Sequence, residues 1–483
     1  MRFPLRHLAK PAFFLAFAAL LGGPACERKE PMVERRFQII VEENTRLIAA
    51  VRAQDPDYLA AGYDETANSG AGGYSPEGMR ILTAANAELR AILAGGERAR
   101  ALAANKTVRA DIERQVAAIR GLEFKRPVDY QVLNRKEIKQ TMAGKLDEVY
   151  SEKEFTDMTE AMSAVGLLPT GYPLREKYID LLGEQVAAFY DQHTHKLYMY
   201  EDASLDNAQN RVVLAHELTH ALQDQHFSLK RLPLEIKTND DRAVAASALV
   251  EGDATLVMSE FMLKNLSKQM LKDSVVSSFT QNMKQLETAP RYLREMLVFP
   301  YLRGQEFCAT LFGAGDYAAV TKAYAEPPSS TAQILHPQKY LANPREEPIA
   351  IAWSQLEVKG EKPAADNCVG EMGLRILFTE WLDATTAERA AAGWRGDRYL
   401  YYPGGQALVW KTVWATAADA AEFFAAEQQL LTKRHSPARP RTTQFTFEAD
   451  TPRILRLRQT PAHEVILIDT ASAAWADALE TLR

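Results

Sequence analysis

The stretch VVLAHELTHAL, residues 212–222, contains the most informative pattern in the sequence. It lies within a helical pattern over about 206–225, and the apolar residues on both sides of its polar centre predict a buried helix. Residues four apart share one face of a helix, so His216 and His220 can direct two imidazoles at one point, while Glu217 lies on an adjacent face. Burying such side chains without partners is costly, so the pattern requires a chemical explanation.

The spacing of these three residues suits catalytic zinc. Two neutral imidazole nitrogens serve as ligands, and the glutamate can take a proton from a water bound to the ion. Zinc lowers the pKa of such a water from about 15.7 to about 7, which allows it to attack a carbonyl at neutral pH. We therefore expect Zn²⁺ as the cofactor, His216 and His220 as ligands and Glu217 as the general base. The alternative is a chance occurrence in which both histidines are ordinary core residues.

Catalytic zinc needs a third protein ligand and one open position. The next strong helical pattern contains Glu251 among apolar neighbours, in the sequence ALVEGDA. We favour Glu251 as the third ligand, because a helix packed beside the first would bring its carboxylate to the two imidazoles. His226, six residues beyond His220, is the first alternative. Asp253 and Asp241 are the remaining candidates.

The segment 186–264 resembles the gluzincin group of metallopeptidases, in which a helix bearing Glu-Gly-x-Ala follows the zinc helix and supplies a glutamate ligand. This resemblance implies a zincin-like core, peptidase activity and Glu251 as the third ligand. Gluzincins often place an aspartate four residues after that glutamate, where it orients the first histidine. Here Thr255 stands at that position and Asp253 is expected on another face of the helix. The sequence therefore does not identify the residue that orients the first histidine, His216.

His226 has the spacing of the third histidine in a second group, the metzincins. In that group a glycine between the second and third histidines breaks the helix and turns the chain back to the metal. This sequence has Gln223 at the glycine position, which favours a continuous helix. Met258 lies in a helical pattern rather than in a turn. We therefore favour the gluzincin-like arrangement over the metzincin-like one.

Two segments near the predicted zinc helix are candidates for substrate contacts. The β-prone runs 186–190 and 196–200 flank a turn and predict a hairpin, whose edge strand could bind a substrate backbone. Gluzincins stabilise the developing oxyanion with a tyrosine or histidine from the following lobe, and the resemblance leaves several candidates open. These candidates are Tyr301, Arg303, His336 and Tyr340. We take Tyr301 and His336 forward as catalytic candidates.

Composition places the chain among ordinary globular proteins and excludes one class of partner. The chain has 483 residues, which predicts two or three domains, and hydrophobic residues make up 47% of it. Lys and Arg number 57 and Asp and Glu number 63, so the net charge is −6. Nucleic-acid binding requires a clustered basic surface, and this balance gives no support for it. A peptide or protein substrate is the expected partner.

The first residues resemble an export signal. Three basic residues precede the uncharged apolar run 12–21, and small residues then lead to Cys26. The run is too short for a stable membrane span. We expect residues 1–25 to be a signal peptide and Cys26 to be the lipid-modified cysteine of a cell-envelope lipoprotein. If it is not acylated, the protein is expected to be periplasmic or secreted. The lipid at Cys26 would be the only membrane attachment.

We expect an α+β protein that is predominantly helical, with a zincin-like core and an edge hairpin before the zinc helix. The predicted parts are a signal peptide (1–25), a helical region (26–125), a zincin-like catalytic domain (126–347) and a C-terminal α+β region (348–483). The helical pattern of 283–325 is expected to break at Pro300. Cys308 and Cys368 could form a disulfide in an oxidising compartment or remain two buried thiols.

These observations predict a zinc-dependent hydrolase, and more narrowly a peptidase. A second possibility keeps the metal and base but acts on a non-peptide amide. A third belongs to another class, a zinc-binding or catalytically inactive lipoprotein that serves assembly or binding in the envelope. Glu217 argues against the third possibility, because a structural zinc site needs no general base.

Overall fold

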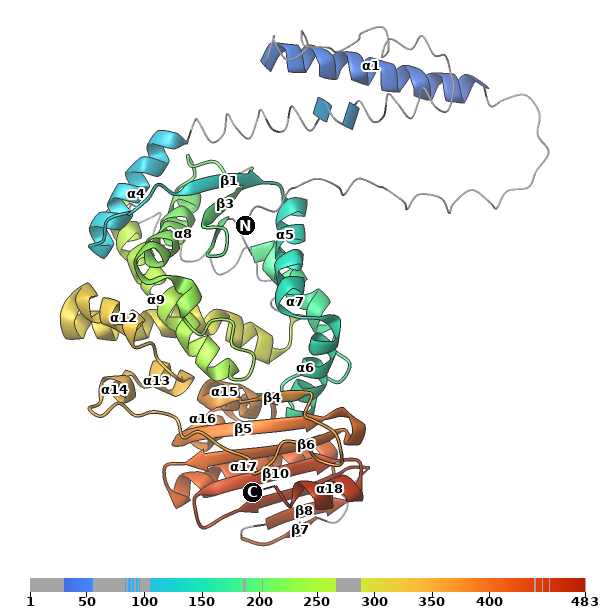
Figure 1. Cartoon of the computed structure of the whole chain (residues 1–483), viewed down its shortest axis with the longest axis vertical. Helices are drawn as coiled ribbons and strands as arrows, with labels where there is room; N and C mark the ends of the chain where they lie inside the picture. The colour runs from blue at the N-terminus through green and yellow to red at the C-terminus, as the bar shows by residue number, and fades with distance from the viewer. Residues whose placement is uncertain are drawn as a thin grey trace. The chain divides into compact units, whose positions relative to one another are not determined.

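The structure is a computed structural model of the chain (Figure 1). It describes residues 30–54, scattered positions between 83 and 95, and then 105–185, 188–201, 203–265, 288–437, 440–444, 446–450 and 452–482. The predicted signal peptide and Cys26 lie outside the described residues. The chain divides into two compact units, Met1–Arg100 and Ala101–Arg483. The first contains helix α1 (Glu30–Gln54), where Asn44 donates a 2.7 Å hydrogen bond to Asn86.

The second unit consists of a mainly helical part followed by a large sheet with its own helices. Its helices are α4 (Lys106–Arg120), α5 (Arg135–Val149), α6 (Glu152–Val165), α7 (Leu174–Gln185), α8 (Ala208–Phe227), α9 (Asp240–Asn265), α12 (Arg291–Ala325), α13 (Thr331–Leu335), α14 (Pro337–Leu341), α15 (Gly370–Trp381), α16 (Ala384–Ala391), α17 (Ala417–His435) and α18 (Ala473–Leu479). The α+β class predicted from the sequence is confirmed. Among the described helices, none combines the length and apolar character that crossing a bilayer requires.

A small sheet lies beside α8 and contains the predicted hairpin. Its strands are β1 (Asp129–Leu133), β2 (Ala188–Asp191) and β3 (Lys196–Tyr200), in the order β1-β3-β2. Strand β2 is antiparallel to β3, with Tyr190 opposite Leu197, and β1 is parallel to β3. The hairpin prediction is therefore confirmed for the described residues. Strand β2 stands at the edge of this sheet, on the side that faces α8.

Helix α4 belongs to the second unit. The reason is its apolar face, since Ile112, Val116 and Ile119 are buried in one core with residues of the small sheet, α8 and α9. The unit boundary accordingly falls at residue 100, ahead of this helix.

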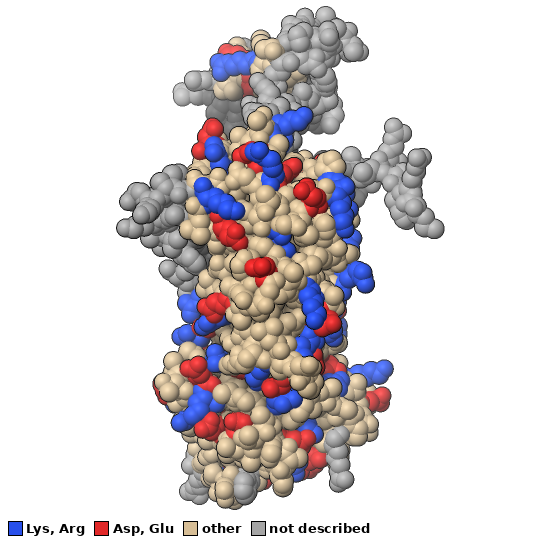
Figure 2. All heavy atoms as spheres, turned by 90° about the vertical axis from the view of Figure 1, so that its left-hand side faces the viewer, with Lys and Arg blue, Asp and Glu red and all other residues tan. Residues whose placement is uncertain are grey.

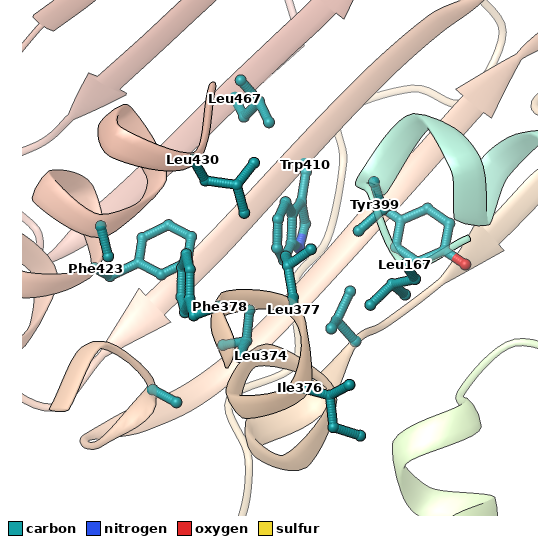
Figure 3. Close-up of a cluster of buried hydrophobic side chains, with 14 of the residues drawn as sticks. Leu167, Leu374, Ile376, Leu377, Phe378, Tyr399, Trp410, Phe423, Leu430 and Leu467 are labelled. Carbon is teal, nitrogen blue, oxygen red and sulfur yellow. The ribbon is translucent and has the colours of Figure 1, made fainter. Parts of the chain in front are cut away.

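The C-terminal sheet is antiparallel and has helices on both faces. Its strands are β4 (Ala365–Asn367), β5 (Trp394–Tyr402), β6 (Ala407–Trp414), β7 (Arg441–Thr442), β8 (Thr446–Asp450), β9 (Ile454–Gln459) and β10 (Glu464–Thr470), in the order β4-β5-β6-β10-β9-β8-β7. Side chains alternate between the faces, so Trp410 packs against Phe423 of α17 while its neighbour Val409 joins the core beneath α18. Figure 3 shows the first of these cores.

Helix α12 does not break at Pro300, contrary to the sequence-based expectation. The helix runs from Arg291 to Ala325, and its non-helical backbone angles occur at Gly315 and Asp316. A proline removes one backbone hydrogen bond and strains the turn before it, but packing can hold the helix together. Phe299 and Phe307, on either side of Pro300, are buried against α9.

Helices α9 and α12 cross with their backbones in contact. A Cβ atom on Gly304 would lie 2.1 Å from the carbonyl oxygen of Ala248, and one on Gly252 would lie 2.2 Å from that of Gly304. Only glycine permits this approach. Glu251 immediately precedes Gly252, and Tyr301 lies one turn before Gly304. The crossing therefore sets the separation between Glu251 and Tyr301.

We expect Gly304→Ala to lower the free energy of unfolding by about 1–3 kcal/mol, or more, because the new methyl group meets backbone rather than a movable side chain. Gly313→Ala in the same helix is the matched control, since nothing lies within 4 Å of a Cβ there. Chemical denaturation of both variants measures the difference. Equal stability of the Gly304→Ala variant and the wild type would show that the two helices can separate without loss.

Cys308 and Cys368 are two free, buried thiols. The Cys308 thiol donates to the carbonyl of Leu249, whereas the Cys368 thiol lies 3.1 Å from the side-chain oxygen of Asn239. Leu249 lies within α9, and Asn239 directly precedes this helix, ten positions earlier. Ten helical residues span roughly 15 Å along the helix axis. The two sulfur atoms are thus held at different levels of this helix, too far apart for a disulfide.

Candidate metal centre

Helix α8 places two imidazoles side by side, as its spacing predicts. Asn207 caps the helix by accepting a hydrogen bond from the backbone N–H of Gln209. His216 and His220 are only 7% and 8% exposed, and their rings meet edge to face with centroids 4.6 Å apart. Their Nε2 atoms are 3.0 Å apart. Both histidines therefore direct the same ring nitrogen at one point.

Glu251 of α9 completes a triangle with the two imidazoles. Its Oε2 lies 3.1 Å from Nε2 of His216 and 3.4 Å from Nε2 of His220. Tetrahedral zinc, with bonds of about 2.0–2.1 Å, places neighbouring ligand atoms about 3.3 Å apart. All three edges of the triangle are close to that value. The donor set, two imidazoles and one carboxylate, also matches catalytic zinc, so these residues fit such an ion.

The electrostatics of the triangle favour a positive charge at its centre. Burial would raise the pKa of Glu251, but the adjacent His220 and His216 hold it well below its ordinary value. Burial would likewise lower the pKa of His220, but the Glu251 carboxylate raises it to about 9. The carboxylate of Glu251 thus favours a positive charge at the point where a cation could bind.

Glu217 lies beside the triangle and is held by strand β2. The backbone N–H of Tyr190 donates to its Oε2 over 2.8 Å, and the Tyr190 hydroxyl donates to Asp224, two turns further along α8. Burial raises the pKa of Glu217 above its ordinary value, and the charge of Glu251 acts in the same direction, whereas the imidazoles oppose it. A carboxylate with a raised pKa is suited to accept a proton near neutral pH.

Tyr301 is the oxyanion candidate that the structure brings to the centre. Its ring is nearly parallel to that of His216, with centroids 5.9 Å apart, and 43% of the residue is exposed. The charge of Glu251 raises the pKa of its hydroxyl well above the ordinary value, and a hydrogen bond to Glu251 acts in the same direction. The protonated hydroxyl is therefore a hydrogen-bond donor beside the triangle.

The other oxyanion candidates lie away from the triangle. His336, at the junction of α13 and α14, places its Nε2 2.7 Å from Glu371 Oε1 in α15. This pair belongs to the cluster around Asp241, roughly 15 Å along α9 from Glu251. Arg303 pairs with Glu306 on its own helix, and the Tyr340 hydroxyl donates to the carbonyl of Glu326. The structure thus brings Tyr301, but not His336, to the candidate centre.

The alternative third ligands also have other partners. Nε2 of His226 lies 2.7 Å from the carbonyl oxygen of Glu123. Asp241 accepts hydrogen bonds from the backbone and side chain of Thr331. Asp253 forms a buried ion pair with Arg120. Among the described residues, His216, His220 and Glu251 form the one group suited to hold a metal ion.

Sequence reasoning missed one residue that contacts the triangle. Oε1 of Gln223 lies 2.9 Å from Nδ1 of His220. In the sequence, Gln223 stands out only because it occupies the position of the metzincin glycine. A usable signal was present, because a residue three positions after His220 lies on the same side of a helix.

A cavity of about 880 Å³ lies elsewhere, between α6 and the C-terminal sheet. Its lining includes Glu160, Arg434 and Arg453 and none of the three triangle residues. Arg434 donates to the carbonyls of Ser163 and Ala164 at the end of α6. This cavity is therefore separate from the candidate centre.

Comparison with known protein families finds a match outside the centre. A family described as a domain of unknown function (DUF8575) matches residues 357–480. The match covers the C-terminal sheet with its helices and none of the triangle residues. No curated protein and no solved structure matches the chain. The geometry of the centre is therefore the basis for a functional proposal.

Proposed function

We propose that this chain is a zinc-dependent peptidase with a zincin-like core, in which His216, His220 and Glu251 hold the ion. The observation that carries the proposal is the triangle of ligand atoms with edges of 3.0, 3.1 and 3.4 Å. Glu217 beside it supports a catalytic role over a purely structural one, because a structural zinc site is closed by four protein ligands and needs no base.

The surrounding residues have roles that follow from their placement. When bound, zinc would supply a Lewis acid that polarises a carbonyl and acidifies a water. Glu217 takes the proton of the attacking water and can pass it to the departing amine. The hydroxyl of Tyr301 donates a hydrogen bond to the carbonyl oxygen as negative charge develops there.

A substrate backbone could lie along β2, the edge strand next to Glu217. The N–H of Tyr190 is already bound by Glu217, so this amide does not pair with a substrate strand. Alternate residues of a strand present their backbone N–H and C=O groups to the same side, so Ala188, two positions before Tyr190, supplies the backbone groups for such pairing. This arrangement favours peptides over small amides, because a small amide has no backbone to pair with a strand.

We expect the purified protein to hold about one zinc per chain and to cleave a peptide library. A chelator should stop cleavage and added zinc should restore it. The double variant His216→Ala, His220→Ala should lose the metal, as elemental analysis would show. Unchanged zinc in that variant would refute the centre, and zinc binding without cleavage of any peptide would refute the peptidase activity.

A further inference from the structure

Behind the triangle, a series of buried polar contacts runs from His220 to Arg120. Gln223 bonds to His220 through Oε1, and its Nε2 donates to Asp253 Oδ2 over 3.1 Å. Asp253 Oδ1 in turn lies 2.8 Å from Nε of Arg120. Gln223, Asp253 and Arg120 are each at most 1% exposed. These contacts link α8, α9 and α4, and the sequence separates Arg120 from Asp253 by 133 positions.

The hydrogen bonds of Gln223 determine the orientation of its amide group. Nε2 donates both to the carbonyl of Val250, over 3.0 Å, and to Asp253. Both partners only accept hydrogen bonds, so a flipped amide would set its oxygen against two acceptors. Oε1 therefore faces His220, and it can only accept. Nδ1 of His220 must carry a proton, which leaves the lone pair of a neutral His220 on Nε2, toward Glu251.

We propose that Gln223 is a positioning residue that holds His220 in its metal-binding orientation, and that Asp253 with Arg120 prevents the amide from turning. This inference rests on the proposed zinc centre. The two imidazoles differ in the partners of their Nδ1 atoms. Nδ1 of His220 contacts Gln223, whereas Nδ1 of His216 is buried and has no hydrogen-bond partner in the described part of the chain. One of the two histidine ligands is thus fixed by the protein, and the other is oriented by its packing.

The ion pair behind Gln223 is packed against aromatic side chains. The guanidinium of Arg120 lies over the ring of Tyr317, 4.7 Å from its centroid, and 5.9 Å from that of Phe227. The Tyr324 hydroxyl adds a 2.8 Å hydrogen bond to Asp253. A buried ion pair whose atoms have several partners resists rearrangement, because breaking it leaves an uncompensated charge in the core.

The test compares Gln223→Met, which keeps the length of the side chain but removes the acceptor, with Gln225→Met on the same helix. Gln225 bonds only to the backbone of residues 125 and 126 and does not contact the centre. Competition with a chelating dye should show about 10- to 100-fold weaker zinc binding in Gln223→Met and no change in Gln225→Met. The visible spectrum of the cobalt-substituted protein should also change only in Gln223→Met.

The outcomes separate this inference from the proposed function. A wild-type chain that binds no zinc overturns both, whereas wild-type affinity in Gln223→Met overturns only the role of Gln223. If Gln223→Met does not fold, histidine NMR of the zinc-loaded wild type decides. The Nδ1 proton of His220 should exchange with water more slowly than that of His216. Equal exchange rates would refute the inference.

Discussion

We expect Glu217→Gln to lower the rate of peptide hydrolysis by about 10²- to 10⁴-fold, the usual contribution of a general base. Zinc content should not change, because Glu217 is not one of the three ligand residues. The new side chain can still accept the hydrogen bond from the Tyr190 N–H through its amide oxygen. Its amide cannot take up a proton, so only the chemical step is lost.

The matched control is Glu235→Gln, which makes the same chemical change in a half-exposed glutamate that pairs with His193 outside the centre. Hydrolysis rates and zinc content of the two variants should be measured together. Cleavage by Glu217→Gln at the wild-type rate would exclude Glu217 as the base. A loss of zinc in Glu217→Gln would show that the carboxylate also holds the metal.

The second large effect is expected for Glu251→Ala, which leaves two protein ligands instead of three. Zinc affinity should fall by more than the roughly 10- to 100-fold that loss of a supporting hydrogen bond costs. His226→Ala is the comparison, because His226 is the alternative ligand by spacing but pairs with the Glu123 carbonyl in the structure. Its zinc affinity should stay close to that of the wild type.

Competition with a chelating dye measures both variants. Loss of zinc from His226→Ala but not from Glu251→Ala would replace the gluzincin-like arrangement with a metzincin-like one. Retention of zinc by both variants would exclude Glu251 as a ligand and leave Asp253 and Asp241 as the remaining candidates. Both aspartates contact other groups in the structure, Arg120 for Asp253 and Thr331 for Asp241, so we expect neither result.

Local patterns predicted the parts of the centre that lie close together in the sequence. The four-residue spacing of His216 and His220 specifies one helix face, and the hairpin before α8 follows from two β-prone runs. Glu251 could be predicted as a ligand because it lies among apolar residues of a helix that is buried over much of its length. The sequence offered Asp253 only as an alternative third ligand. In the structure it bonds to Gln223, which in turn contacts His220.

The features that local patterns missed depend on contacts between distant segments. No local rule connects Arg120 to Asp253, or His336 to Glu371. The rule that a proline ends a helix was outweighed at Pro300 by packing against α9. The pairing of Gly252 with Gly304 likewise appears only when both helices are in place.

Helix α9 connects the candidate centre to the region matched by the domain of unknown function. Its N-terminal end is bound by Asn367, which accepts from the backbone N–H of Asp240, and by Gly370, where a Cβ atom would collide with Asp241. Glu251 lies near the middle of the same helix. Because one helix contacts both regions, we expect the zinc affinity of the proposed centre and the conformation of the matched region to be linked. A ligand that displaces Asn367 should then change the affinity for zinc, and zinc should change the affinity for that ligand by the same factor.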